Sequence, residues 1–238
     1  MKVINRHIYK PIREYQSKYP ILALTGPRQS GKTTLLKTLF PDYRYISLEN
    51  PDAWDFALKD PNGFLAEYND QMIFDEVQQA PALFSFLQTL VDNRPDRMGG
   101  FILSGSQKFH LMDRITQCLA GRVALFKLFP LDIQELKGAN LLSEDPLDQL
   151  IYGFYPAIYD RKISQSVLYS NYVQTYVNRN VTELITIKDL RQFQNFLFLC
   201  AARANQPLNL SALANETGIR QPTAKSWLSG LESSYITF

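Results

Sequence analysis

Residues 26–33 have the types and the spacing of a backbone loop that could hold phosphate groups. They read Gly-Pro-Arg-Gln-Ser-Gly-Lys-Thr, which matches the pattern G-x-x-x-x-G-K-[ST] at each fixed position. Glycine at the first and sixth places lets the backbone bend until successive N–H groups point inward at phosphate oxygens. Lys32 would reach the β- and γ-phosphates, and the Thr33 hydroxyl would bind Mg²⁺. The motif therefore predicts a site for ATP or GTP.

Two acids, Asp75 and Glu76, directly follow the apolar run Met72–Phe74. The carboxyl end of a strand is where open α/β sheets place their ligands. An Asp-Glu pair after an apolar run is more often a solvated strand end. A phosphate loop upstream makes the role in a nucleotide site the favoured interpretation. A nucleotide site needs an acid for Mg²⁺ and a group that orients or deprotonates water, so we assign Asp75 to the metal and Glu76 to the water. The pair favours hydrolysis over phosphoryl transfer.

Further polar residues could complete this site. Ser106 or Gln107, just after the apolar run Phe101–Leu103, could hydrogen-bond the γ-phosphate or the attacking water, although a helix N-cap explains them equally well. Arg122, just before the next expected strand, could reach nucleotide bound by an adjacent subunit and stabilise transition-state charge. The alternative is a helix-terminal surface arginine, and Arg114 is the next candidate for the arginine-finger role.

The elements that must position these residues alternate between strand and helix. The run Ile21–Leu24 before the loop is short and apolar, as a buried parallel strand should be, and Thr33–Leu39 after it has helical spacing. Further strands are expected at 43–48, 72–74, 101–103 and 123–129. Further helices are expected at 52–69, broken at 61–63, and at 82–93 and 109–119. The predicted fold class is α/β, a P-loop NTPase parallel sheet flanked by helices.

A second, helical domain is predicted after the sheet. We place the ATPase domain at residues 1–160 and a helical and winged-helix-like domain at 161–238. The sequence predicts two helices around a glycine-containing turn at residues 210–219 and 222–231, which is the layout of a helix-turn-helix. Its second helix offers only two basic positions, Arg220 and Lys225, so a structural role or a protein partner stays open beside DNA.

Composition excludes several other classes of protein. The 238 residues are 45% hydrophobic and 20% charged with a net charge of +2, which are ordinary globular values. The sequence lacks an apolar stretch of about 18 residues and a signal-peptide core. We therefore expect a cytoplasmic protein without a membrane partner. Cys118 and Cys200 suggest reduced thiols, while His7 and His110 look too isolated to form a metal ligand set.

Several motifs together are specific to one family. They are residues 26–34, 74–78, 103–107, 119–123, 155–161, 199–203 and 223–228. The chain resembles, over nearly its whole length, bacterial and archaeal AAA-type ATPases that carry a C-terminal domain of unknown function. The resemblance implies ATP rather than GTP, Asp75 and Glu76 as the Mg²⁺ and water pair, and Arg122 as a candidate finger. It implies nucleotide binding by Gly26, Pro27, Arg28, Gln29, Ser30, Gly31, Lys32, Thr33 and Thr34.

Two departures from the family pattern stand out. Members continue into a domain reminiscent of restriction-endonuclease folds, whereas this chain ends at Phe238 where a wing strand should be under way, so we expect it to be cut short. Asn180 stands where the family often has an acid.

The predicted function is Mg²⁺-dependent hydrolysis of ATP, with a homo-oligomer that supplies Arg122 in trans and a DNA or protein partner. The alternatives are a nucleotide-operated switch with slow turnover and a DNA-binding regulator with a vestigial site.

Overall fold

The computed structural model describes residues 4–106, 115, 117–175 and 189–237. The chain divides into two compact units, Met1–Ile163 and Ser164–Phe238. None of the described helices is long and apolar enough to cross a membrane.

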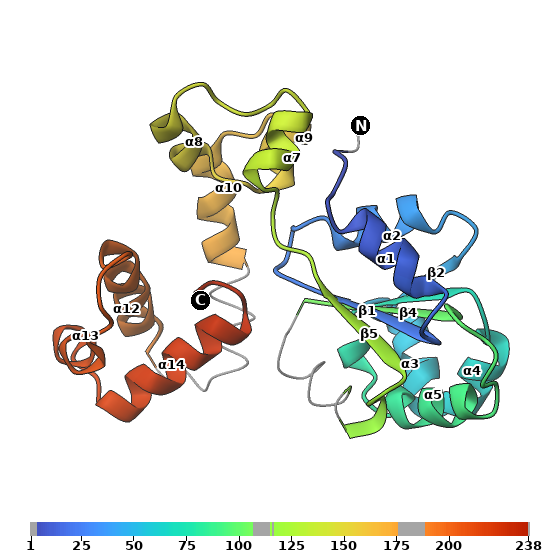
Figure 1. The fold of residues 1–238 in the computed structure, drawn as a ribbon. Coiled ribbons are helices and arrows are strands. Elements are labelled where there is room, and N and C mark those ends of the chain that lie inside the picture. Colours follow the sequence, from blue (N-terminus) through green and yellow to red (C-terminus); the bar gives the residue numbers. More distant parts are fainter. Residues whose placement is uncertain (1–3, 107–114, 116, 176–188, 238) are drawn as a thin grey trace. The chain divides into compact units, whose positions relative to one another are not determined.

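The first unit is built on a five-stranded sheet in the order β2-β3-β4-β1-β5, in which every neighbouring pair is parallel (Figure 1). This confirms the predicted P-loop sheet. The order places β4 between β1 and β3, so the strand that precedes Ser106 separates the phosphate-loop strand from the strand that carries Asp75. The strands are β1 (Ile21–Thr25), β2 (Arg44–Ser47), β3 (Met72–Asp75), β4 (Phe101–Gly105) and β5 (Val123–Lys127).

Helices cover both faces of this sheet, which is why its central strands are apolar without alternation. On β1, Ile21 and Ala23 pack into one core, with side chains of α3, α4 and α5, whereas Leu22 and Leu24 pack into the other, with side chains of α1 and α2 (Figure 1). These helices are α1 (Tyr9–Gln16), α2 (Lys32–Leu39), α3 (Pro51–Lys59), α4 (Pro61–Glu67) and α5 (Leu83–Asp92), and η1 (Val77–Gln79) is a short 3₁₀ turn.

Three short helices follow β5 in the first unit, and the sequence patterns above did not predict them. They are α7 (Ile133–Gly138), α8 (Pro146–Tyr152) and α9 (Pro156–Arg161). A capping box starts α7: the Asp132 carboxylate accepts from the Glu135 N–H at 2.7 Å, and the Glu135 carboxylate accepts from the Asp132 N–H at 3.1 Å.

The second unit is helical over its described residues, 164–175 and 189–237. Trp227 fills its core, with the indole ring 5.3 Å from the Phe193 ring and 5.5 Å from the Phe196 ring. Gly218 ends α13 in the left-handed region at φ +73°. Residues 235–237 lie in a turn and irregular backbone, so they do not form the expected wing strand. The helices are α10 (Gln165–Tyr172), α12 (Leu190–Ala202), α13 (Leu210–Thr217) and α14 (Gln221–Ser233).

Candidate active site

The phosphate loop joins β1 to α2 and depends on backbone conformations that favour glycine. Gly26 has φ +150°, Gly31 has φ +95°, and Gln29 between them has φ +63°. A Cβ at position 26 would lie 2.1 Å from the carbonyl oxygen of Leu128, so only glycine fits there. Helix α2 begins at Lys32 and directs its N-terminus at the loop, as an anion site requires.

We expect Gly26→Ala to weaken ATP binding by at least about tenfold, because the added methyl group must displace the loop or the Leu128 backbone directly after β5. Gly138→Ala is the matched control, since nothing lies within 4 Å of a Cβ there. That control should bind ATP normally and gain up to about 1 kcal/mol of stability. Equal ATP affinity in the two variants, measured by titration calorimetry, would contradict the steric argument.

The Lys32 ammonium group is buried inside the loop. It donates hydrogen bonds to the carbonyl oxygens of Gly26 at 3.0 Å and Pro27 at 2.9 Å, and the residue is only 6% exposed. Burial lowers its pKa, while the negative charges of Glu76 and Asp75 oppose that shift. A buried ammonium group at the N-terminus of a helix is suited to bind a polyanion.

Asp75 ends β3 beside the loop and is only 5% exposed. One of its carboxylate oxygens accepts two hydrogen bonds of 2.7 Å, from the Thr33 hydroxyl and from the Tyr45 hydroxyl. The structure thus brings together the two residues that the sequence assigned to Mg²⁺. Tyr45, on β2, was not among the predicted site residues. Burial, and then the hydrogen bond to Asp75, raise its pKa well above the usual value.

Tyr45→Phe should lower the free energy of unfolding by about 1.5 kcal/mol, because it removes a hydrogen bond to a charged acceptor. It should also raise the Mg²⁺ concentration needed for half-maximal ATP turnover, because Asp75 loses one of the two side-chain hydroxyl groups that donate to it. Tyr43→Phe is the matched control, since that hydroxyl donates to the Gly99 carbonyl instead. An unchanged Mg²⁺ requirement in Tyr45→Phe would leave Tyr45 with a role in stability alone.

Glu76 adopts the left-handed region, at φ +53°, directly after β3. This conformation costs a non-glycine residue about 1–2 kcal/mol and is concentrated at functional sites. Its carboxylate accepts hydrogen bonds from the Ser106 hydroxyl at 2.9 Å, from the Ser106 N–H at 3.3 Å and from the Gln78 amide. Ser106 therefore lies in the predicted site, against the carboxylate assigned to water.

Arg122 lies away from this cluster. It directly precedes β5, and its carbonyl accepts from the Ile21 N–H at the start of β1, so it sits at the opposite edge of the parallel sheet from Gly26. A strand of this length separates the two edges by about 16 Å. The guanidinium forms a two-pronged ion pair with Asp92, at 2.5 and 2.8 Å, and this hydrogen bonding lowers the pKa of Asp92.

The remaining predicted residues divide into two groups. Arg28, in the phosphate loop, donates to the Glu49 carboxylate at 3.0 Å in an exposed ion pair. The candidates Gln107 and Arg114 lie outside the described residues, as do His110 and Asn180, for which the sequence predicts no role.

The family comparison agrees with this geometry. Residues 18–137, just over half of the chain, match the AAA domain family. The chain belongs to the AAA domain family. Residues 143–238 match a domain of unknown function (DUF8612). The AAA match contains the phosphate loop, Asp75, Glu76, Ser106 and Arg122.

Two curated relatives and one solved structure extend the comparison. Uncharacterized proteins Mb2031c of Mycobacterium bovis and Rv2008c of Mycobacterium tuberculosis are each 29% identical over 241 residues, which cover 99% of this chain and 53% of the relative. The chain thus spans about half the length of these relatives. The Walker-type ATPase PABY2304 of Pyrococcus abyssi has a similar fold, with a TM-score of 0.64 at 14% identity, covering 98% of this chain and 90% of that one.

Proposed function

We propose that this chain hydrolyses ATP in a Mg²⁺-dependent reaction. The observation that carries the proposal is the convergence of three segments at one edge of the sheet. The Thr33 hydroxyl lies 2.7 Å from the Asp75 carboxylate, Glu76 follows Asp75 in the chain, and the Ser106 hydroxyl lies 2.9 Å from the Glu76 carboxylate. The AAA fold and family support an ATPase, and the side-chain geometry supports hydrolysis over binding alone.

The residues present fit a magnesium–nucleotide complex. Thr33 and Asp75 offer the hard oxygen donors that Mg²⁺ prefers, already adjacent. The loop backbone takes positive φ values at Gly26, Gln29 and Gly31, the kind of bend that lets successive N–H groups face an anion. When bound, Mg²⁺ would neutralise the charge that develops on the phosphate oxygens. Thr33 and Asp75 would hold it.

The chain's own groups then have distinct tasks. Lys32 would exchange the Gly26 and Pro27 carbonyls for phosphate oxygens, which carry more negative charge. Glu76 would orient the attacking water and accept its proton. Ser106, which donates to the Glu76 carboxylate, would set the orientation of that base.

Steady-state release of inorganic phosphate tests this proposal. The purified chain should release phosphate from ATP in the presence of Mg²⁺, and this release should stop when the metal is chelated. Equal release with and without the metal would contradict the roles of Thr33 and Asp75.

We further propose that Arg122 acts on nucleotide held by an adjacent copy of the chain, because the opposite edge of the sheet puts it out of reach of its own phosphate loop. Arg122→Ala should leave ATP affinity unchanged and lower turnover at least tenfold. Mixing this variant with Lys32→Ala should restore part of the turnover. The Arg122→Ala copy supplies an intact phosphate loop, and the Lys32→Ala copy supplies Arg122.

Asp92→Asn is the control for that experiment, since it loosens the ion pair but keeps the guanidinium. It should retain turnover. Failure of the mixed variants to recover any activity would remove the role in trans.

A further inference from the structure

Arg6 contacts the phosphate loop from the N-terminal segment, and nothing in the sequence patterns above singles it out. It is 7% exposed. Its guanidinium donates to the Ser30 carbonyl at 3.0 Å, to the Glu135 carboxylate at 2.9 Å, and to the carbonyls of Phe129 at 2.6 Å and Pro130 at 3.1 Å. One side chain thus joins the loop to the segment after β5 and to the start of α7.

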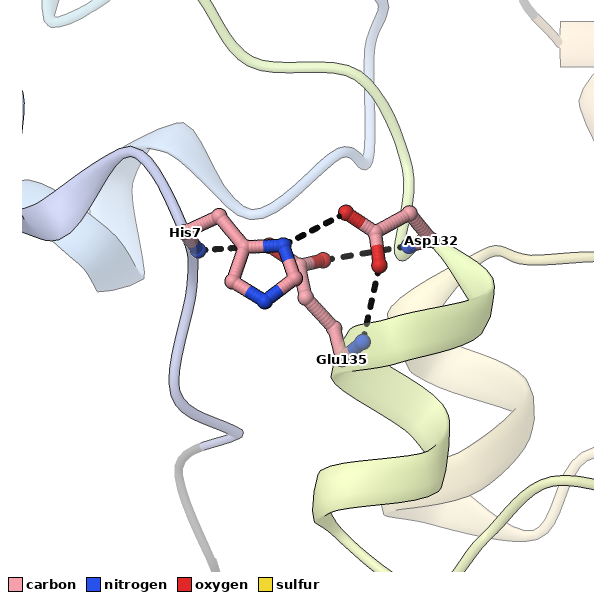
Figure 2. Close-up of side chains that lie close together, drawn as sticks. All are labelled: His7, Asp132 and Glu135. Atoms are coloured by element: carbon pink, nitrogen blue, oxygen red, sulfur yellow. Dashed lines mark hydrogen bonds and ion pairs between the residues drawn. The ribbon is translucent and has the colours of Figure 1, made fainter.

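The Glu135 carboxylate that receives Arg6 is itself fixed. Besides the Arg6 bond, it accepts from the backbone N–H of His7 at 2.8 Å and of Asp132 at 3.1 Å, and its side chain is only 4% exposed. Figure 2 shows the two backbone bonds to Glu135, from His7 and Asp132, together with the contact of the His7 ring with Asp132, where Nδ1 lies 2.9 Å from the carboxylate. The N-terminal segment is therefore tied to the start of α7 at Arg6 and again at His7.

The same cluster could suggest a metal site, because His7, Asp132 and Glu135 hold potential ligand atoms within 4.8 Å of one another. Its hydrogen bonds argue otherwise. The two Glu135 oxygens already accept three bonds, one of them from the Arg6 cation, whose positive charge would repel a metal ion. The cluster is better suited to hold Arg6 than to bind a cation.

The bond to Ser30 fixes a peptide group that matters for phosphate binding. A trans peptide unit carries its C=O and its N–H on opposite sides. Because the Ser30 carbonyl points at Arg6, the Gly31 N–H must point away from Arg6. Gly31 is the residue that leads into α2, at φ +95°, where phosphate loops present inward-facing N–H groups.

We propose that Arg6 is a positioning residue that holds the Ser30–Gly31 peptide in the orientation that binds phosphate. The inference rests on the proposed nucleotide site. Arg6 lies outside the residues that match the AAA domain family, which begin at residue 18. Arg6 itself touches no reacting atom, since it acts through the Ser30 carbonyl.

A paired substitution separates positioning from stability. Arg6→Met alone leaves Glu135 as a buried unpaired charge and should lower the unfolding temperature. Arg6→Met with Glu135→Gln removes both charges, so most of the nucleotide-free unfolding temperature should return. The dissociation constant for ATP should nevertheless stay about tenfold above the wild-type value, because the Ser30 carbonyl still lacks its charged donor.

Two further variants keep this test decisive. Arg6→Lys retains the charge near Glu135 but cannot bond all four acceptors, so it too should bind ATP more weakly. The control removes an exposed ion pair elsewhere in the first unit, by Arg97→Met with Asp70→Asn, and should not change ATP binding.

The proposal is overturned if the Arg6→Met, Glu135→Gln double variant, or Arg6→Lys where the double variant does not fold, binds ATP within twofold of wild type. Failure of the proposed nucleotide site would give a different result, because Lys32→Ala would then bind ATP as tightly as the wild-type chain.

Discussion

Glu76→Gln should lower ATP turnover by about 10²–10⁴-fold, the usual contribution of a positioned general base. Glutamine has the same size and can still accept the hydrogen bond that the Ser106 hydroxyl donates, but it cannot take a proton from water. ATP affinity should therefore stay close to wild type. Phosphate release and equilibrium ATP binding, measured on the same preparation, separate these two effects.

An exposed carboxylate provides the control for that result. Glu67→Gln, at the end of α4, should keep full turnover. If Glu76→Gln retains more than a tenth of the wild-type rate, Glu76 is not the base, and another group must activate the water.

Lys32→Ala should weaken ATP binding by about 100-fold, because it removes the buried ammonium group that we assign to the phosphates. Wild-type chain at 100 times its dissociation constant gains about 2.7 kcal/mol of stability from bound ligand, and the variant should lose most of that gain. Thermal unfolding with and without ATP measures the difference. A variant with the full ATP-induced shift would contradict the assigned role of Lys32.

The same variant gives a prediction for pH. Burial lowers the pKa of Lys32 in the folded state below its unfolded value of 10.5. Between the two values the unfolded chain binds the additional proton, so the stability of wild type relative to Lys32→Ala should rise as the pH approaches 10.5. Nucleotide-free unfolding temperatures between pH 7 and 10 would show it, and the opposite trend would contradict the burial of a charged ammonium.

The phosphate loop and the two acids were predictable because each is a local pattern. The loop needs glycine at fixed places, and a buried parallel strand reads as a short apolar run, so Asp75 at the end of β3 follows from Met72–Phe74. The parallel sheet follows from the alternation of such runs with helices. The strand order does not, since it depends on how each crossover packs.

The side chains that hold the site in place, Tyr45 and Arg6, could not be predicted in this way, because their partners lie far from them in the chain. Tyr45 and Asp75 are 30 residues apart, and Arg6 and Glu135 are 129 apart. Asp132 and Glu135 did carry a signal, the D-x-x-E pattern of a capping box, which predicts the start of α7. Nothing in that pattern indicates that Glu135 would also receive Arg6.

Single-turnover phosphate release tests the central claim most directly. Chain bound to ATP in the presence of a chelator is mixed with excess Mg²⁺, and inorganic phosphate is followed over time, with Asp75→Asn treated in the same way. The wild-type chain should release about one phosphate per bound ATP after the metal is added, and Asp75→Asn should release it far more slowly. Stable ATP binding by the wild-type chain, with no release after Mg²⁺, would contradict the assignment of this site to hydrolysis.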